Sequence, residues 1–326
     1  MRRIAFGLAL LVATAVRGQS QGIPAGTARI TGGRFTFVST PADAPLAKNL
    51  LAEALARDSF PGLPRPRLPA TVMIAPDERT FREWIGGGAP EWGIGVAIPE
   101  EQRIVMQGRA ASSRAGDPRV TLRHELAHLA LHEYMANAPP RWFDEGYASY
   151  AAGEWGRDDV LASSIVLALR GVPRFSALDT LISGGTTRAE QGYALAHRAV
   201  ADLAALDPQG GMTLLFRYWH DGRSLDGAFR QAYGITLDGF EATWRQTTRR
   251  RYGALALLGD VGFASLVLFL IVGPFWLVRR RRDRERLEAM RAADELADRR
   301  ERESALAALL GEGEQTGGSD DQIKGR

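Results

Sequence analysis

The sequence contains no cysteine and only two lysines, Lys48 and Lys324, among its 326 residues. Without cysteine, the chain has neither a disulfide framework nor a zinc site with thiolate ligands. The net charge of +3 is too small to indicate nucleic-acid binding. Histidine is also scarce, but three of the five histidines, His124, His128 and His132, fall within nine positions. A cluster drawn from so few residues is more informative than one in a histidine-rich chain.

The N-terminus has the pattern of an export signal. Met1-Arg2-Arg3 forms a basic start, and an apolar run from Ile4 to Val16 follows it. That run is too short for a comfortable membrane span and long enough for the core of a signal peptide. Ala13-Thr14-Ala15 has the small residues of a cleavage site. We therefore predict a signal peptide over residues 1–18, with a buried N-terminal helix as the alternative.

A second apolar segment lies near the C-terminus. Val261 to Val278 holds 18 consecutive uncharged residues, which is the lower limit for a transmembrane helix. Arg279 to Arg282 follow directly and resemble the basic flank on the cytoplasmic side of a membrane. We predict a transmembrane helix over 254–278 and a charged cytoplasmic tail over 279–326. The alternatives are a buried core helix, or a chain whose central domain lies in the cytoplasm.

The region between these segments, residues 23–252, is predicted to be one extracytoplasmic α+β domain. A small, mainly antiparallel sheet comes first and a helical part follows. Alternating or β-rich patterns predict strands at Arg34–Ser39, Ala70–Ile74, Ile94–Ile98 and Arg103–Gln107. Helical spacing predicts helices at Pro45–Arg57, Phe81–Ile85, 117–135, 142–152, 157–170, 188–206, 211–219, 224–233 and 237–250.

The sequence His124-Glu125-Leu126-Ala127-His128 carries the clearest chemistry. It is an HExxH motif inside a predicted helix, where residues four apart lie on one face and both imidazoles can reach the same metal ion. Glu125 faces the same cleft without being a ligand, so it can take a proton from metal-bound water and pass it to a leaving amine. Neutral imidazole suits Zn²⁺, which usually has three protein ligands in a catalytic site. A chance match to the motif is the alternative.

The third ligand must come from elsewhere in the chain. His132 lies eight residues from His124, which is roughly 12 Å along a helix axis and too far for one coordination sphere. We expect it to be a surface or hydrogen-bonded polar residue. Glu145 is the better candidate, because a turn at Pro139-Pro140 would bring a second helix back against the first. Gly146 would permit helices to approach closely.

The HELAH motif, followed by Trp142-Phe143-Asp144-Glu145-Gly146-Tyr147-Ala148, resembles the gluzincin metallopeptidases. The similarity is greatest to the aminopeptidase-N-like, or peptidase MA, branch. It implies His124, His128 and Glu145 as zinc ligands and Glu125 as the catalytic base. The chain has no G-x-M-E-N segment, the exopeptidase motif of the aminopeptidases, which favours an endopeptidase.

The same resemblance implies further roles near the metal. Tyr193, on a later predicted helix, is the first candidate for stabilising the oxyanion, and His197, one turn on, is the second. Ordinary core packing of Tyr193 is the alternative. Asp144 can support a ligand histidine without binding the metal, or be a solvated carboxylate at the start of its helix. An edge strand at Ile94–Ile98 can pair with an extended peptide.

The sequence thus predicts a zinc-dependent peptidase that acts on a peptide or protein substrate. The alternative is a non-catalytic membrane-anchored sensor or scaffold that keeps a metallopeptidase-like fold. The predicted charged tail favours that alternative, and the complete ligand set with Glu125 argues against it.

Overall fold

The computed structural model describes residues 26–86, 94–109, 116–135, 137–154, 160–161, 171–184 and 186–315. The predicted signal peptide at 1–18 lies outside these residues, as does most of the helix predicted at 157–170. The chain divides into two units, Met1–Leu258 and Gly259–Arg326. The first unit contains the sheet and the residues of the predicted metal site.

Among the described residues, five strands form one sheet in the order β1-β2-β3-β5-β4. The strands are β1 (Ala28–Gly32), β2 (Phe35–Ser39), β3 (Ala70–Ala75), β4 (Gly95–Ile98) and β5 (Arg103–Gln107). The β1–β2 and β4–β5 pairs are antiparallel, whereas β2–β3 and β3–β5 are parallel. The β4 strand, which corresponds to the predicted edge strand, forms one edge of the sheet.

The prediction of a mainly antiparallel sheet is wrong, because the sheet is mixed. The chain passes from β2 to β3 through helix α1 (Ala44–Ala56), and a helical crossover returns it in the same direction. Strand β1 was not predicted from the sequence. It pairs with β2 through a tight turn at Gly33, whose φ of 54° favours glycine.

Side chains alternate in direction along each strand, so they point to both faces of the sheet, and helices bury both faces. On one face, Phe37, Val72 and Ile104 belong to the main core, which α1 and helix α3 (Pro118–Tyr134) share. On the other face, Val38, Met73, Val105 and others pack against Phe81 and Trp84 of helix α2 (Glu78–Trp84). Helix α3 therefore lies directly against the sheet, beside β4 and β5.

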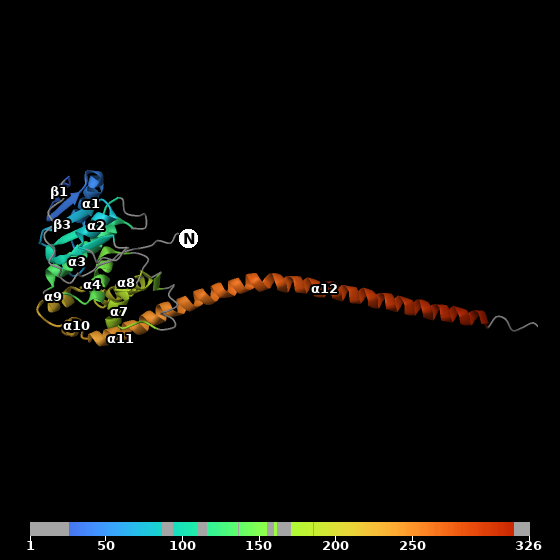
Figure 1. The fold of residues 1–326 in the computed structure, drawn as a ribbon. Coiled ribbons are helices and arrows are strands. Elements are labelled where there is room, and N and C mark those ends of the chain that lie inside the picture. Colours follow the sequence, from blue (N-terminus) through green and yellow to red (C-terminus); the bar gives the residue numbers. More distant parts are fainter. Residues whose placement is uncertain are drawn as a thin grey trace, which may run out of the picture. The chain divides into compact units, whose positions relative to one another are not determined.

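The remaining helices of the first unit follow α3 and complete the α+β order that the sequence predicts (Figure 1). They are α4 (Arg141–Ala152), α7 (Phe175–Ile182), α8 (Thr186–Ala204), α9 (Thr213–His220), α10 (Leu225–Tyr233) and α11 (Leu237–Thr248). Most begin and end within a few residues of the predicted bounds, but α7 was not predicted. Helix α4 packs against both α3 and α8, so it links the HExxH helix to the helical part of the fold.

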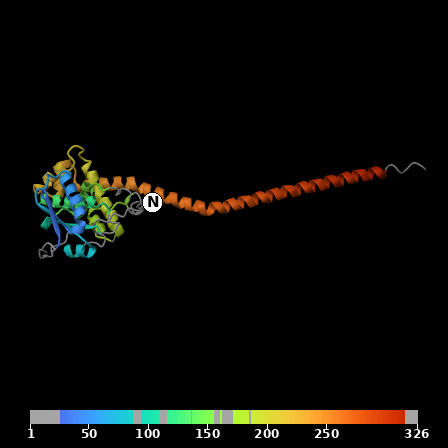
Figure 2. The ribbon, with the colours of Figure 1, turned by 90° about the horizontal axis from the view of Figure 1, so that it is seen from above.

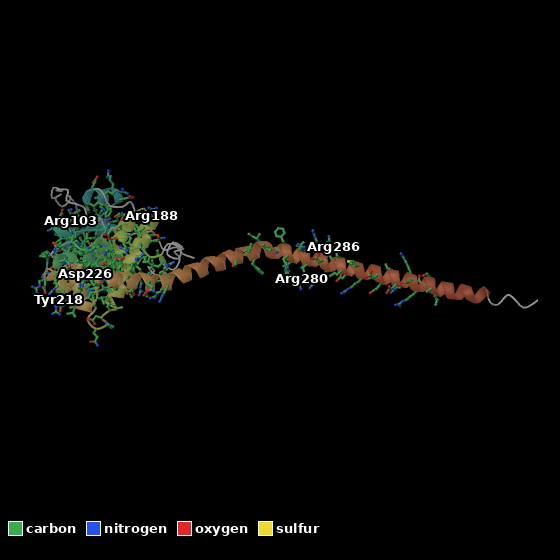
Figure 3. The ribbon with its side chains drawn as sticks, turned by 90° about the horizontal axis from the view of Figure 1, so that it is seen from below. Arg103, Arg188, Tyr218, Asp226, Arg280 and Arg286 are labelled. Carbon is green, nitrogen blue, oxygen red and sulfur yellow. The ribbon has the colours of Figure 1, made fainter. Side chains whose placement is uncertain are left out.

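The C-terminal part of the chain forms helix α12 (Ala254–Gln315), which contains 62 residues (Figure 2). The transmembrane helix predicted at 254–278 is wrong: among the described residues, no helix is long and apolar enough to cross a membrane. The uncharged run is a small part of α12, which continues into charged sequence after Val278. Arg280 and Arg286 extend from that later part of the helix (Figure 3). The predicted membrane anchor is therefore not supported.

Candidate metal centre

Helix α3 carries the HExxH motif, and its start has the predicted cap. The Asp117 carboxylate accepts a hydrogen bond of 2.9 Å from the Arg119 backbone N–H, and Pro118 occupies the first turn. His124, Glu125 and His128 are all fully buried. The two imidazole centroids lie 4.8 Å apart, as expected for residues one turn apart on the same helical face.

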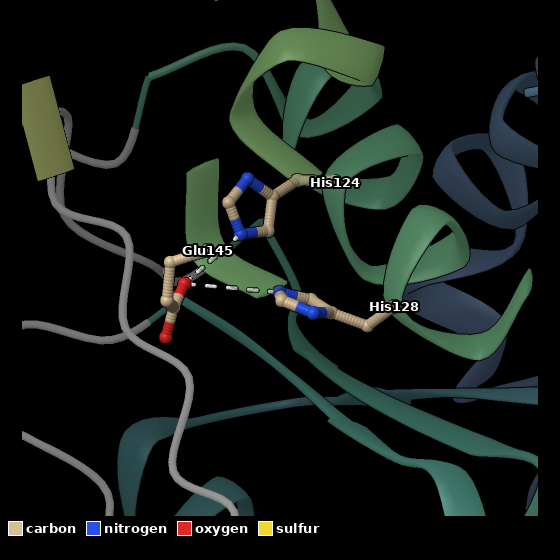
Figure 4. Close-up of side chains that lie close together, drawn as sticks. All are labelled: His124, His128 and Glu145. Atoms are coloured by element: carbon tan, nitrogen blue, oxygen red, sulfur yellow. Dashed lines mark ion pairs between the residues drawn. The ribbon is translucent and has the colours of Figure 1, made fainter. Parts of the chain in front are cut away.

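Helix α4 brings Glu145 to these two histidines. It begins at Arg141, directly after Pro139-Pro140, and is in close contact with α3. Glu145 Oε2 lies 3.6 Å from His124 Nε2 and 3.8 Å from His128 Nε2 (Figure 4). One ligand atom from each residue lies within 4.8 Å of the other two. The structure thus brings together the three side chains that the sequence suggested as ligands.

The second carboxylate oxygen of Glu145 points to a different partner. Glu145 Oε1 lies 3.9 Å from Nε of Arg141, one turn earlier on α4. Oε2 therefore faces the imidazoles while Oε1 faces a guanidinium.

Carboxylates also hold the outer nitrogens of both histidines. His128 Nδ1 lies 2.6 Å from Asp144 Oδ1, and His124 Nδ1 lies 2.9 Å from Glu154 Oε1. Asp144 therefore supports a histidine, one of its two predicted roles. These contacts favour the tautomer that carries its proton on Nδ1, which places the lone pair of each ring on Nε2, the nitrogen that faces Glu145.

His132 is a hydrogen-bonded polar residue, as expected from its distance along the helix. Its Nε2 lies 2.8 Å from Asp144 Oδ2, so Asp144 joins His128 to His132. Burial acts to raise the pKa of Asp144, but the two histidines outweigh that effect and hold it well below its usual range.

Glu154 was not identified from the sequence as a partner of His124. The one local signal for it was Gly153, a glycine of the kind that ends a helix. Gly153 follows α4 with a φ of 69°, and the Glu154 backbone N–H then bonds to the Ser149 carbonyl at 3.2 Å. This turn directs the Glu154 side chain back toward α3. Thirty positions separate His124 from Glu154, so the pair is a product of the tertiary fold.

Glu125 lies beside the sheet edge as well as beside the histidines. A Cβ atom at Gly95, the first residue of β4, would lie 3.0 Å from Glu125 Oε1 and 2.8 Å from Thr121 Cγ2. Glycine at this position therefore makes room for the carboxylate. Burial raises the pKa of Glu125 well above its ordinary value, and the charges of Glu154 and Asp144 add to that rise. The Ala97 backbone lowers this pKa, although neither Glu125 oxygen has a partner at hydrogen-bond geometry among the residues that the structure describes.

The chemistry of this donor set fits a divalent cation. His128 Nε2 and both carboxylate oxygens of Glu145 are buried without a hydrogen-bond partner among the described residues. Burial raises the pKa of Glu145 well above its ordinary value, and the Asp144 charge adds to the rise. Leaving such groups unsatisfied is costly, and a cation would compensate them. Two imidazole nitrogens and one carboxylate oxygen form a ligand set found in catalytic zinc sites.

Helix α8 places the two candidates for oxyanion stabilisation. Tyr193 is almost fully buried, with 2% of its surface exposed, which also agrees with the alternative that it is an ordinary core residue. His197 lies one turn later, and its Nδ1 is 3.1 Å from Ser149 Oγ on α4. An oxyanion role for Tyr193 or His197 stays a prediction.

Comparison with known families agrees with this geometry. A family model described as the Peptidase MA superfamily matches residues 65–250. The chain belongs to the Peptidase MA superfamily. The matched range includes the HExxH helix, Glu145 and Glu154, and it ends before α12. A search of curated proteins found no match to the sequence. Membership supports a metallopeptidase-type fold for the first unit.

Proposed function

We propose that this protein is a zinc-dependent endopeptidase in which His124, His128 and Glu145 bind the metal and Glu125 is the general base. One observation carries the proposal: the Nε2 atoms of both histidines and Oε2 of Glu145 converge in the interior of the fold, and Glu125, next to His124, is buried with them. When bound there, zinc would polarise the peptide carbonyl and lower the pKa of a water molecule.

Other residues of the chain have separate roles in the proposed reaction. Glu125 accepts the proton of the attacking water and delivers it to the amine that leaves, because its carboxylate is next to the ligands but not directed to a partner of its own. Asp144 and Glu154 hold the Nδ1 protons of the two histidines. Strand β4 lies at the edge of the sheet, and the structure describes no further strand beside it; Gly95 brings this edge close to Glu125, so it can offer backbone groups to an extended peptide.

Two features of the sequence support the finer assignment. The Trp142-to-Ala148 segment favours the aminopeptidase-N-like branch of the superfamily, since the acidic ligand lies in the same context. The absence of a G-x-M-E-N segment favours cleavage within a chain over removal of its first residue.

The test compares wild type with Glu125→Gln in the full-length protein. Both should bind about one zinc per chain, whereas cleavage of an unstructured protein should fall by roughly 10²–10⁴ in the variant, the usual contribution of a general base. Glu133→Gln is the matched control. It is on the same helix, but its carboxylate accepts hydrogen bonds from the Arg67 and Leu68 backbone, at 2.7 and 3.2 Å.

Three results would decide the matter. Full activity in Glu125→Gln would exclude the general-base role. Wild-type protein without zinc would exclude the metal site. Wild-type protein that holds zinc but cleaves none of a broad set of peptides would favour the non-catalytic sensor or scaffold.

A further inference from the structure

A chain of hydrogen bonds connects His124 to helix α8. His124 Nδ1 lies 2.9 Å from Glu154 Oε1, and the Ser149 hydroxyl donates to Glu154 Oε2 at 2.7 Å. Ser149 Oγ lies in turn 3.1 Å from His197 Nδ1. The residues of this hydrogen-bond network come from three parts of the fold. His124 lies on α3, Ser149 lies on α4, Glu154 directly follows the glycine that ends α4, and His197 lies on α8. None of these contacts follows from the HExxH motif.

Proton counting fixes the direction of each bond. A serine hydroxyl has one proton, and Ser149 donates it to the Glu154 carboxylate. The contact between Ser149 Oγ and His197 Nδ1 must then use a proton on His197. At the other end, a carboxylate oxygen can only accept, so His124 Nδ1 carries the proton there. Both Glu154 oxygens therefore receive a hydrogen bond, and both histidines carry their proton on Nδ1.

The Glu154 side chain is held where it is by the end of α4. Gly153 takes a left-handed conformation, and the chain reverses so that the Glu154 backbone N–H reaches the Ser149 carbonyl. The Ser149 side chain and main chain thus both contact Glu154, at Oε2 and at the backbone N–H. Ser149 and Glu154 are buried, with 0% and 6% exposure, so water competes little for these bonds.

We propose that Glu154 is a positioning residue for His124, and that Ser149 and His197 hold the Glu154 carboxylate from the side of α8. The inference rests on the proposed metal site. The charge of Glu154 makes the His124 imidazole a stronger ligand and fixes its ring orientation, while the Ser149–His197 pair fixes the carboxylate. Helix α8 thereby contributes to metal affinity through His197 without supplying a ligand.

Zinc affinity is the first measurement, made on the full-length protein by competition with a chelator. Glu154→Gln should weaken zinc binding by roughly 10–100-fold, the usual effect of losing such a partner. Ser149→Ala leaves the Glu154–His124 contact in place, so its loss should be smaller. Asp179→Asn is the matched control: its carboxylate also contacts α4, through the Trp142 backbone N–H at 2.8 Å, but at the opposite end of that helix. The control should bind zinc as wild type does.

The tautomer of His197 is the second measurement, and a purely structural role of Glu154 would not change it. The chain has only five histidines, so ¹⁵N spectra of histidine-labelled protein are simple, and His197→Gln identifies the signals of that residue. Wild type should carry the His197 proton on Nδ1. In Glu154→Gln, the amide oxygen faces His124 and the amide NH₂ faces Ser149. The hydroxyl then donates to His197, whose proton moves to Nε2.

The outcomes separate this inference from the proposed function. If wild type binds no zinc, the metal site itself fails, and this proposal fails with it. If wild type binds zinc and His124→Ala does not, but Glu154→Gln binds it with unchanged affinity, only the positioning role is overturned. An identical His197 tautomer in wild type and Glu154→Gln overturns the connection to α8. Weaker zinc binding together with the tautomer change supports the whole proposal.

Discussion

Gly146 lies where α4 and α8 are in close contact, one residue after the proposed ligand Glu145. The sequence suggested that this glycine permits helices to come together, and the structure identifies α8 as the partner. A Cβ atom at Gly146 would lie 2.7 Å from the Ala196 carbonyl carbon and 2.9 Å from Val200 Cγ2, and still closer to the Ala196 oxygen. Most of these atoms are backbone, so they can move only if the helix moves. Gly146→Ala should therefore separate α4 from α8.

The size of the effect follows from these distances. Carbon atoms in contact prefer a separation of about 3.5 Å or more, so the helices must move apart by about 0.8 Å. Overpacking of this kind costs about 1–3 kcal/mol, and alanine returns up to about 1 kcal/mol through its helix propensity. We expect a net loss of about 1–2 kcal/mol in the free energy of unfolding. For a unit of this size, that corresponds to a fall in Tm of about 2–8 °C.

Thermal unfolding and zinc competition measure the two consequences. The shift of α4 also moves Glu145, so zinc affinity should fall together with Tm. Gly273→Ala on α12 is the control, because no atom of the described residues lies within 4 Å of its added Cβ. The control should change Tm little and leave zinc affinity unchanged. A Gly146→Ala protein with wild-type Tm and wild-type zinc affinity would refute the reasoning.

Two further predictions concern the metal and the position of α3. Zinc at 100 times its Kd should stabilise the protein by about 2.7 kcal/mol, or roughly 5–11 °C in Tm, and Glu145→Gln should abolish that shift in a thermal melt. The metal-free Glu145→Gln protein should be at least as stable as metal-free wild type, because burial opposes the charged carboxylate. If zinc raised the Tm of both proteins equally, Glu145 would not be a ligand. Arg123→Met should lower the free energy of unfolding by about 2–3 kcal/mol in a denaturant titration, since its guanidinium donates to three carbonyls, those of Arg57, Ser59 and Ala151. Arg119→Met, at an exposed position of the same helix, should change it by less than about 0.5 kcal/mol, and equal losses in the two variants would show that the carbonyl contacts do not matter.

Most helices of the first unit could be predicted because the signals that define them are local in the sequence. Asp117 and Pro118 define the start of α3, and the spacing of His124 and His128 places them on one face. Strand pairing was harder to predict from the sequence, because the direction of β3 relative to β2 depends on the path that α1 takes between them. Strand β1 and helix α7 have weak patterns and form through contacts with neighbours. The uncharged run before Arg279 suggested a membrane span, but it belongs to a longer helix with mostly charged sequence after it.

By itself the sequence determined which groups make up the candidate site: two imidazoles and a carboxylate on one helix, with an acidic residue in a second segment shortly after. Local spacing is sufficient for that, because a helix turn brings residues four apart together whatever surrounds it. Only the tertiary structure decided which groups surround these residues. Glu154, Ser149 and His197 meet because α4 ends at Gly153 and packs against α8, and Gly146 has its purpose only through that packing. Such contacts join residues tens of positions apart, and no local pattern records them.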